Sequence, residues 1–393
     1  MTTRTYTKTC LCWLLGLLLF SAMANRVVDP FWYYRDVDIK GFNAEKPQFY
    51  RFERQFKPIL LKDLRPEAVV FSSSFLEIGF NPKHPALTQD GTYRAYNFGM
   101  VAASYDRVFC NVLYALENAP LKTAVIGVHP THAPKFECSG QMKTMGTVDG
   151  ATLLFSYAAL KATYKTLTLQ NRKPTETKDG MLFYNRDKGY EIERMFRHFL
   201  NKYRSEHPDK TCTLPQGYAD TPAWSYPQTP ADMEGLRFLL QKLANAHDKT
   251  KLVVYPFHAL WLEMEMACGD VLTRWHALYA MAMLVDEINQ AHPGAVELWD
   301  FQGMADFTTE KIRDNQVKYW QDHGHFNYEM GDVMLDTMFR RNPPPADSRG
   351  DGFGVMLTAQ SVPERFKRFF EHRQEFMDAN PWFAQELARF INP

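Results

Sequence analysis

Two segments far apart in the chain carry residues that could form one catalytic site. Residues 67–80 read as an apolar strand followed by three serines, of which Ser74 is the expected nucleophile. Residues 319–326 place Asp322 three positions before His325. A serine hydroxyl needs a base to take its proton, and the base needs an acceptor that orients it. The chain order Ser, Asp, His therefore suggests a serine hydrolase or acyltransferase.

Other interpretations of the same residues stay open. Serines at a strand end often cap the next helix. His323 competes with His325 for the role of base, and we expect Ser73, His323 and His258 to line the pocket. The Asp-His-Gly-His run could also hold a metal with His258 or His129, although no accompanying carboxylate has helical metal-ligand spacing.

A developing oxyanion requires N–H donors aimed at it. The candidates are the backbone N–H groups of Ser74 and Gly99 and the side chain of Asn97, although Gly99 could be only a turn glycine. The sequence contains no G-x-S-x-G elbow, which argues against an α/β-hydrolase. It also contains no phosphate-binding loop of the Walker or G-x-G-x-x-G type, and no cofactor is implied.

Composition narrows the class of protein. The chain has 393 residues, of which 45% are hydrophobic and 23% charged, as in ordinary globular proteins. Lys and Arg number 45, equal to Asp and Glu, so the chain has no excess positive charge. Nucleic-acid binding usually requires a basic face, and no nucleic-acid partner is expected.

The N-terminus predicts export. Residues 9–25 are uncharged and follow Arg4 and Lys8, which suits a helix anchored in the inner membrane. Ala22-Met-Ala24 resembles a cleavage site, so a cleaved signal peptide and a soluble exported product are the alternative. Both interpretations place the rest of the chain outside, beginning with a juxtamembrane arm at residues 26–66.

Four cysteines lie beyond this segment: Cys110, Cys138, Cys212 and Cys268. In an exported protein they could form two disulfides with three possible connectivities. Cys138 with Cys212 is a loop-to-loop candidate, and four buried thiols are the alternative.

The remaining pattern predicts an α/β fold. Strands are expected at 68–71, 94–99, 122–128, 251–255 and 296–301, the last taken as the final strand, with helices at 104–118, 232–247, 271–290 and 331–339. Such alternation favours a parallel sheet with its site at the carboxyl ends of the strands. The domain is expected over 67–345, with an inserted cap at 131–230 and a helical tail at 346–393.

Several motifs together resemble the SGNH (GDSL-like) hydrolase superfamily, in particular its exported bacterial branch with the SGNH-like proteins of alginate O-acetylation and teichoic-acid D-alanylation. The resemblance lies in Val69-Val-Phe-Ser-Ser-Ser74, Ile78-Gly-Phe-Asn-Pro82, Tyr96-Asn-Phe-Gly99, Tyr255-Pro-Phe-His258 and residues 319–325. It implies a three-layer α/β/α sandwich with Ser74 as nucleophile, His325 as base and Asp322 as its orienter. It also implies a periplasmic domain that uses an acyl donor and an envelope glycan, and that could work with a membrane acyl-transfer partner protein.

The sequence departs from that family at three positions. Ser72 stands where the family has glycine, and Phe75 follows the serine where relatives often have a polar residue. The block that usually supplies an oxyanion Asn reads Ile126-Gly-Val-His129. A catalytically inactive protein that binds a glycan or a partner is therefore the alternative to an enzyme.

Overall fold

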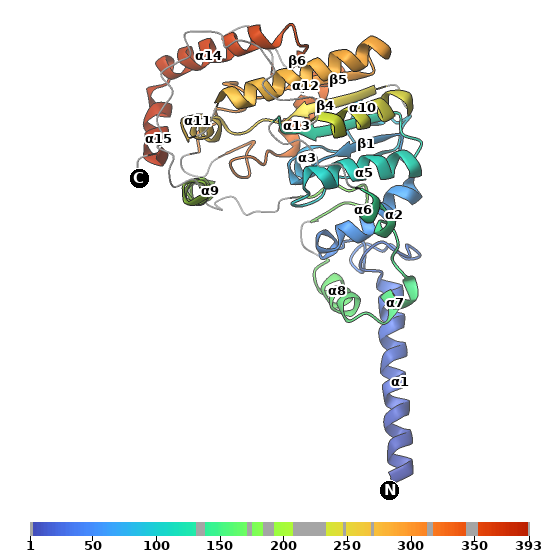
Figure 1. Cartoon of the computed structure of the whole chain (residues 1–393). Coiled ribbons are helices and arrows are strands. Elements are labelled where there is room, and N and C mark those ends of the chain that lie inside the picture. The colour runs from blue at the N-terminus through green and yellow to red at the C-terminus, as the bar shows by residue number, and fades with distance from the viewer. Residues whose placement is uncertain are drawn as a thin grey trace.

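A computed structural model of the chain describes residues 3–130, 138–170, 175–183, 192–206, 233–246, 249–268, 271–312, 317–342 and 353–391. These residues form a mixed α/β domain with a six-stranded sheet, from which the long helix α1 (Thr3–Val28) extends (Figure 1). The fold class expected from the sequence is therefore confirmed at the level of a mostly parallel α/β protein.

The sheet has the strand order β2-β1-β3-β4-β5-β6. Strands β1 to β5 are parallel, and β6 runs antiparallel to β5. Their bounds are β1 (Ala68–Phe71), β2 (Ala95–Asn97), β3 (Thr123–Val128), β4 (Lys249–Val254), β5 (Val296–Asp300) and β6 (Val355–Leu357). The prediction that β5 is the last strand is wrong, because a three-residue edge strand is too short to show a pattern.

The order of the strands reverses direction at β1. From β1 the chain passes to β2 on one side and then to β3 on the other. In a parallel sheet, the chain can leave two neighbouring strands in opposite directions. Ligands commonly bind in the crevice that forms at the carboxyl ends of those two strands. Here the crevice is expected between the ends of β1 and β3, and the segment with Ser74 begins there.

Helices surround the sheet and fill the connections. Those not yet introduced are the 3-10 helix η1 (Phe49–Arg51) and α2 (Glu53–Leu64), α3 (Ser74–Gly79), α4 (Pro85–Thr88), α5 (Tyr105–Asn118), α6 (Ser139–Thr144), α7 (Gly150–Leu154), α8 (Tyr157–Thr168), α9 (Ile192–Glu206), α10 (Glu234–Ala246), α11 (Ala259–Cys268), α12 (Val271–Ala291), α13 (Tyr328–Phe339), α14 (Val362–Ala379) and α15 (Pro381–Ile391).

Side chains that alternate along the buried strands enter different hydrophobic clusters. Val69 and Phe71 of β1 belong to a cluster with residues of α2, α5, α10 and α12. Val70 belongs to a second cluster with residues of α3, α4 and α13. Because successive strand residues point to opposite faces, both faces of β1 are covered, which accounts for its continuous apolar sequence.

The segment expected to be a juxtamembrane arm is packed onto the domain. Phe31, Phe49, Phe56 and Leu60 are each no more than 3% exposed and lie in the same cluster as Val69. The ring of Phe31 stacks on that of Phe56 with centroids 4.6 Å apart. Residues 26–66 thus supply part of the core that supports β1.

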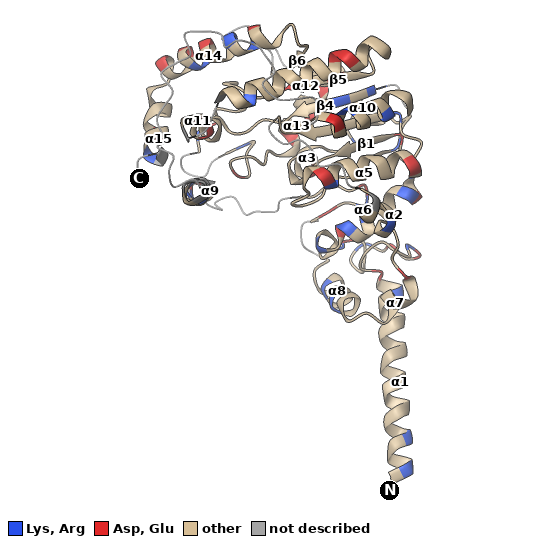
Figure 2. Ribbon diagram, viewed as in Figure 1, with Lys and Arg blue, Asp and Glu red and all other residues tan. Residues whose placement is uncertain are grey.

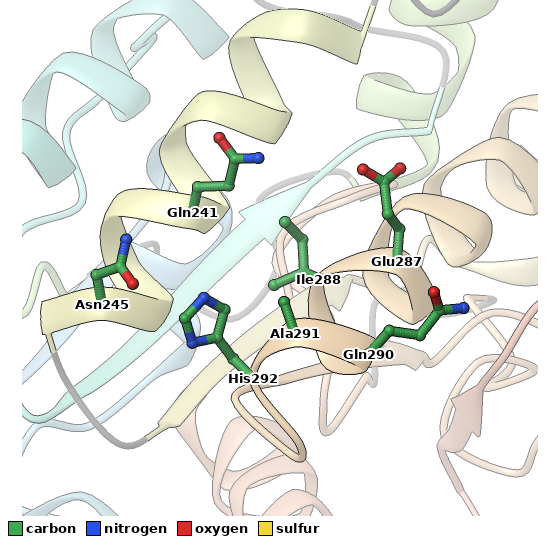
Figure 3. A pocket seen from close by; sticks show the side chains of 7 residues that line it. All are labelled: Gln241, Asn245, Glu287, Ile288, Gln290, Ala291 and His292. Carbon is green, nitrogen blue, oxygen red and sulfur yellow. The ribbon is translucent and has the colours of Figure 1, made fainter.

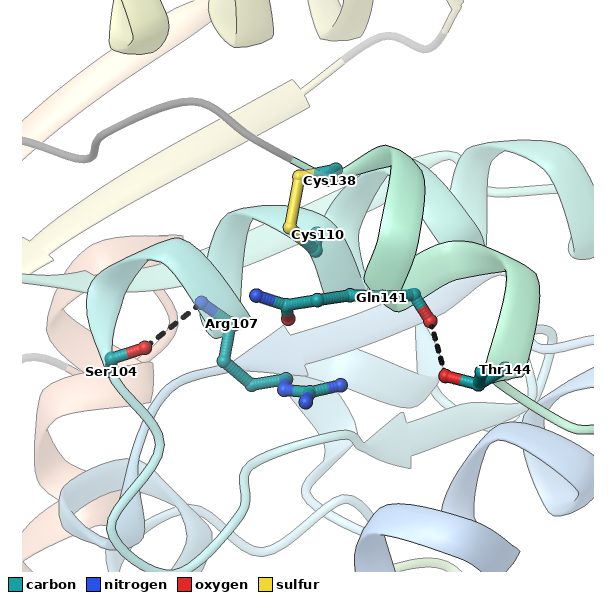
Figure 4. The surroundings of a disulfide bond; sticks show 6 residues. All are labelled: Ser104, Arg107, Cys110, Cys138, Gln141 and Thr144. Atoms are coloured by element: carbon teal, nitrogen blue, oxygen red, sulfur yellow. Dashed lines mark hydrogen bonds between the residues drawn. A yellow bond between two sulfur atoms is a disulfide. The ribbon is translucent and has the colours of Figure 1, made fainter.

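One disulfide is present among the described residues, between Cys110 in α5 and Cys138 just before α6 (Figure 4). The prediction that Cys138 pairs with Cys212 is therefore wrong, and Cys212 lies outside the described residues. The bridge joins the start of the expected cap to α5, which packs on the sheet. Four cysteines allow three connectivities, so spacing alone could not identify this pair.

Helix α1 is long and apolar enough to cross a membrane. Its charged residues lie near its ends, with none from residue 9 to residue 25 (Figure 2). The last turn of α1 is tied to the domain: the Asn25 amide donates to the Leu154 carbonyl (2.8 Å), and the Thr163 hydroxyl donates to Asn25 Oδ1 (2.9 Å). The Ala22-Met-Ala24 motif lies inside this continuous helix.

A buried ammonium group joins the elements beneath the expected site. Lys57 of α2 is fully buried, and its Nζ donates to Glu77 Oε1 of α3 (2.6 Å) and to the carbonyls of Gly99 (2.7 Å) and Gly180 (2.8 Å). Glu176 and Glu53 lie 3.1 and 4.0 Å from the same nitrogen. Burial would lower the pKa of Lys57, but these carboxylates raise it, so the lysine is charged.

The excess of carboxyl groups around Lys57 predicts a pH dependence of stability. Burial and the charge of Glu77 raise the pKa of Glu53 to about 10, and burial raises that of Glu176 to about 8. The folded protein then binds more protons than the unfolded chain, so the free energy of unfolding falls as the pH rises from about 4.5 to about 8. We expect Glu53→Gln to flatten this dependence by up to about 1.4 kcal/mol per pH unit, measured by urea unfolding of the full chain in detergent.

Glu364→Gln is the matched control, since Glu364 is exposed and pairs with Arg368 one turn away on α14. It should leave the pH dependence unchanged. If the free energy of unfolding depends on pH equally in Glu53→Gln and in the unsubstituted protein, Glu53 does not have the raised pKa that we assign to it.

Candidate active site

The turn from β1 into α3 places Ser74 at the carboxyl edge of the sheet. β1 ends at Phe71, Ser73 has an extended backbone at the N-cap, and Ser74 is the first residue of α3. The Ser74 hydroxyl lies 2.7 Å from His325 Nε2 and is partly exposed. A partly exposed serine in contact with an imidazole is the arrangement that nucleophilic catalysis requires.

A tight loop before α13 supplies the histidine and its carboxylate. His325 Nδ1 lies 2.8 Å from Asp322 Oδ2 and 2.9 Å from Oδ1, and Asp322 Oδ1 also accepts the backbone N–H groups of Gly324 (3.0 Å) and His325 (2.8 Å). With the Nδ1 proton directed at Asp322, Nε2 is the acceptor for the Ser74 hydroxyl. The structure thus brings the three residues predicted for catalysis into one chain of hydrogen bonds.

The environment keeps Asp322 ionised. It is 1% exposed, and burial alone would raise its pKa. Attraction to His325 and the hydrogen bonds from its ring and from the Gly324 N–H outweigh burial and hold the pKa of Asp322 well below its usual range. A buried carboxylate that stays charged can orient His325 and stabilise its protonated form.

Aromatic rings fix the plane of the His325 imidazole. The ring of Phe75 stacks on His325 (centroids 4.7 Å apart, planes at 15°) and, in a second stacked contact, on Tyr255 (4.4 Å, 20°). Phe257 meets Phe75 edge-on at 5.6 Å. In the sequence, Phe75 was notable only as a departure after the serine. Its position directly after Ser74 was the signal in the sequence that it lies close to the predicted site.

Gly324 is required by this aromatic packing. A Cβ atom at Gly324 would lie 2.8 Å from the ring of Phe75 and 2.9 Å from that of Phe257. Such distances are not tolerated, so the loop can approach the rings only with glycine between the two histidines.

Asn97 and Gly99, the predicted oxyanion donors, are hydrogen-bonded to other partners. The Asn97 amide donates to the carbonyls of Leu76 (2.9 Å) and Phe80 (2.9 Å), with a longer contact to that of Glu77 (3.3 Å). The Gly99 N–H donates to Asn97 Oδ1 (3.0 Å). Asn97 therefore holds the carbonyl groups of α3, and the backbone N–H of Ser74 remains as the candidate oxyanion donor from the sequence.

This role of Asn97 predicts a loss of stability on substitution. Asn97→Ala would leave buried carbonyl groups of α3 without a donor, at a cost of about 1–3 kcal/mol. Asn118→Ala is a control that removes a single, partly buried bond to the Tyr114 carbonyl and should cost less. Urea unfolding compares the two. Unchanged stability of Asn97→Ala, combined with a slower reaction at Ser74, would return Asn97 to the oxyanion hole.

His258 and His323, two of the predicted pocket residues, are linked by a backbone hydrogen bond beside Asp322 and His325. His258 is fully buried: Nδ1 accepts the Leu260 N–H (3.2 Å) and Nε2 lies 2.7 Å from the Glu310 carbonyl. Its backbone N–H donates to the carbonyl of His323 (3.0 Å). Burial lowers the pKa of both His258 and His323 to about 4, so both are neutral near pH 7.

The metal interpretation finds no matching set of ligands in the part of the chain that the structure describes. Both ring nitrogens of His258 and of His325 are engaged in the contacts above. Three carboxyl groups do converge elsewhere in the described residues, those of Glu53, Glu77 and Glu176. They surround the ammonium of Lys57 and not the histidines.

A hollow between α10 and α12 is distant from this site. It has a volume of about 620 Å³ and is lined by Gln241, Asn245, Glu287, Ile288, Gln290, Ala291 and His292 (Figure 3). Both helices end there just before β4 and β5 begin, at the amino edge of the sheet. The hollow therefore lies opposite the edge that carries Ser74.

Comparison with known proteins does not indicate a function, so a functional conclusion must depend on the geometry of the site. No protein-family model matches this sequence, and no curated protein matches it significantly. The resemblance described above therefore depends on short motifs and on the arrangement of their residues.

Proposed function

We propose that this chain is an exported serine esterase or O-acyltransferase of the SGNH type, acting through an acyl-enzyme on Ser74. The observation that carries the proposal is the hydrogen-bonded chain from Ser74 through His325 to the ionised Asp322. Its place at the carboxyl edge of the sheet, where the strand order reverses between β1 and β3, supports it, because parallel sheets commonly bind ligands at such a point.

The residues have the following roles. Ser74 Oγ attacks the carbonyl carbon of the acyl donor while His325 Nε2 takes the hydroxyl proton, and Asp322 stabilises the imidazolium. The backbone N–H of Ser74 would donate to the oxyanion. His325 returns the proton to the leaving group, then deprotonates the water or sugar hydroxyl that attacks the acyl-enzyme and releases Ser74.

The setting we propose follows from α1 and the sheet. Helix α1 would anchor the chain in a bacterial inner membrane, with the domain, a three-layer α/β/α sandwich, in the periplasm. An envelope glycan would be the acceptor and a membrane acyl-transfer protein a partner. The apolar length of α1 and its hydrogen bonds to the domain support an uncleaved anchor over a signal peptide.

Labelling with a fluorophosphonate tests the nucleophile. We expect a single label that peptide mapping assigns to Ser74 and that is absent in Ser74→Ala. Asp322→Asn should slow labelling by about 10³–10⁴-fold, because His325 loses the acceptor that fixes its tautomer. Ser73→Ala is the control and should label normally, since no hydrogen bond joins the Ser73 hydroxyl to His325 among the described contacts. Normal labelling of Ser74→Ala would refute the proposal.

The stacking of Phe75 on His325 predicts a separate effect on rate. Phe75→Leu removes the ring that fixes the imidazole plane, and we expect labelling to slow by about 2- to 12-fold, equivalent to the ~0.5–1.5 kcal/mol of an aromatic pair. Phe75→Tyr keeps the ring and should retain most of the rate. Equal rates for both variants would show that the stack does not position His325.

A non-catalytic binding protein is the second candidate. The Asn97 amide donates to carbonyls of α3 and its C-cap, and the Gly99 N–H donates to Asn97 Oδ1. Fewer N–H donors then remain for an oxyanion, which favours this second candidate. This candidate predicts a folded chain that is not labelled by fluorophosphonate yet binds an envelope oligosaccharide in calorimetry.

A further inference from the structure

Large apolar side chains that are mostly exposed gather in one region of the molecule. Among the residues that the structure describes, those more than half exposed lie in α1 or are Ile39 (55%), Phe155 (56%), Tyr157 (79%) and Tyr164 (63%). Elsewhere in the described part of the domain such side chains reach at most 47%. Exposed apolar groups that cluster in this way mark an interaction surface, whereas scattered ones do not.

These four residues surround the point where α1 enters the domain, and we call them the collar. Phe155, Tyr157 and Tyr164 belong to α8 and the turn before it, which lie beside the end of α1 (Figure 1). The bond from Thr163 to Asn25 fixes α8 there. Ile39 lies in a loop whose Asn43 donates to the Val28 carbonyl at the end of α1 (3.1 Å).

The length of α1 places the collar at the level of a membrane surface. The uncharged residues 9–25 rise ~26 Å at ~1.5 Å per residue, close to the ~30 Å hydrocarbon thickness of a bilayer. Asn25 then lies at the boundary between hydrocarbon and headgroups. Because Thr163 is bonded to Asn25, α8 lies at the same depth.

The chemistry of α8 suits that depth. Tyr157, Lys161 and Tyr164 are exposed and recur at helical spacing, opposite the buried Thr163. Residues 150–170 contain Lys161 and Lys165 and no acidic residue. Tyrosine is enriched at membrane interfaces, and lysine is attracted to anionic headgroups.

We propose that the collar contacts lipid, so that α8 lies on the outer surface of the membrane that α1 spans. The occupant of the exposed face is thus the headgroup region of an anionic bilayer. This inference depends on the proposed anchoring by α1 and is independent of the chemistry at Ser74.

Photocrosslinking of the full chain tests the contact. The chain carries p-benzoylphenylalanine in place of Tyr164 and is reconstituted into nanodiscs of phosphatidylcholine and phosphatidylglycerol. The matched control carries it in place of Phe238 on α10, an exposed aromatic residue (42%) with Lys242 near its ring. We expect lipid adducts by mass spectrometry at position 164 and only background at 238. Discs without phosphatidylglycerol should lower the yield, by up to about fivefold per lysine.

Alkaline carbonate extraction and fluorophosphonate labelling of the same samples separate the outcomes. Background adducts at 164 in a chain that resists extraction would overturn the lipid contact and leave the anchor standing. Crosslinked dimers at 164 would overturn it in favour of a second copy. Release by carbonate would overturn both anchor and collar, whereas absence of a label on Ser74 alone would refute only the proposed enzyme.

Discussion

The position of Ser74 depends on one buried charge. The Lys57 ammonium is inaccessible to water, and a charge in that state is tolerated only when partners surround it. Its partners come from α3, from the end of β2 and from residues 176–180, so these segments must assemble together around α2. Since α3 begins at Ser74 and contributes Glu77, the same interaction sets where the serine hydroxyl lies.

Asn97 completes this support from the other side. Its amide binds carbonyl groups at the end of α3, while Lys57 binds the carboxylate of Glu77 in the middle. A helix of only six residues has little stability of its own, so its direction is set by such tertiary contacts.

The sequence was most informative where a buried element leads directly into a functional residue. The apolar run of β1 ends just before the serines, and the bounds 68–71 predicted for it are those observed. The Asp322 to His325 spacing is local, so its hydrogen bonds could be anticipated. The Lys57 cluster was missed, because its members are distant in sequence and each resembles a surface residue of an amphipathic helix or loop.

The departure at Ser72 has a structural counterpart on the neighbouring strand. A Cβ atom at Gly127 of β3 would lie 2.6 Å from Ser72 Oγ, so the glycine leaves the space that the serine side chain fills. A larger residue at the end of β1 is thus matched by the absence of a side chain on β3. The two residues are distant in sequence, but packing makes the size of one depend on the size of the other.

The unbroken entry of α1 into the domain governs how an anchored molecule could search for substrate. With Asn25 bonded to two segments of the domain, no slack linker separates α1 from the domain. A flexible linker would let the site reach a range of distances from the bilayer. A stiff connection would hold the site at one distance from it. Encounters would then be two-dimensional, and acceptors would be selected by their distance from the bilayer as well as by their chemistry.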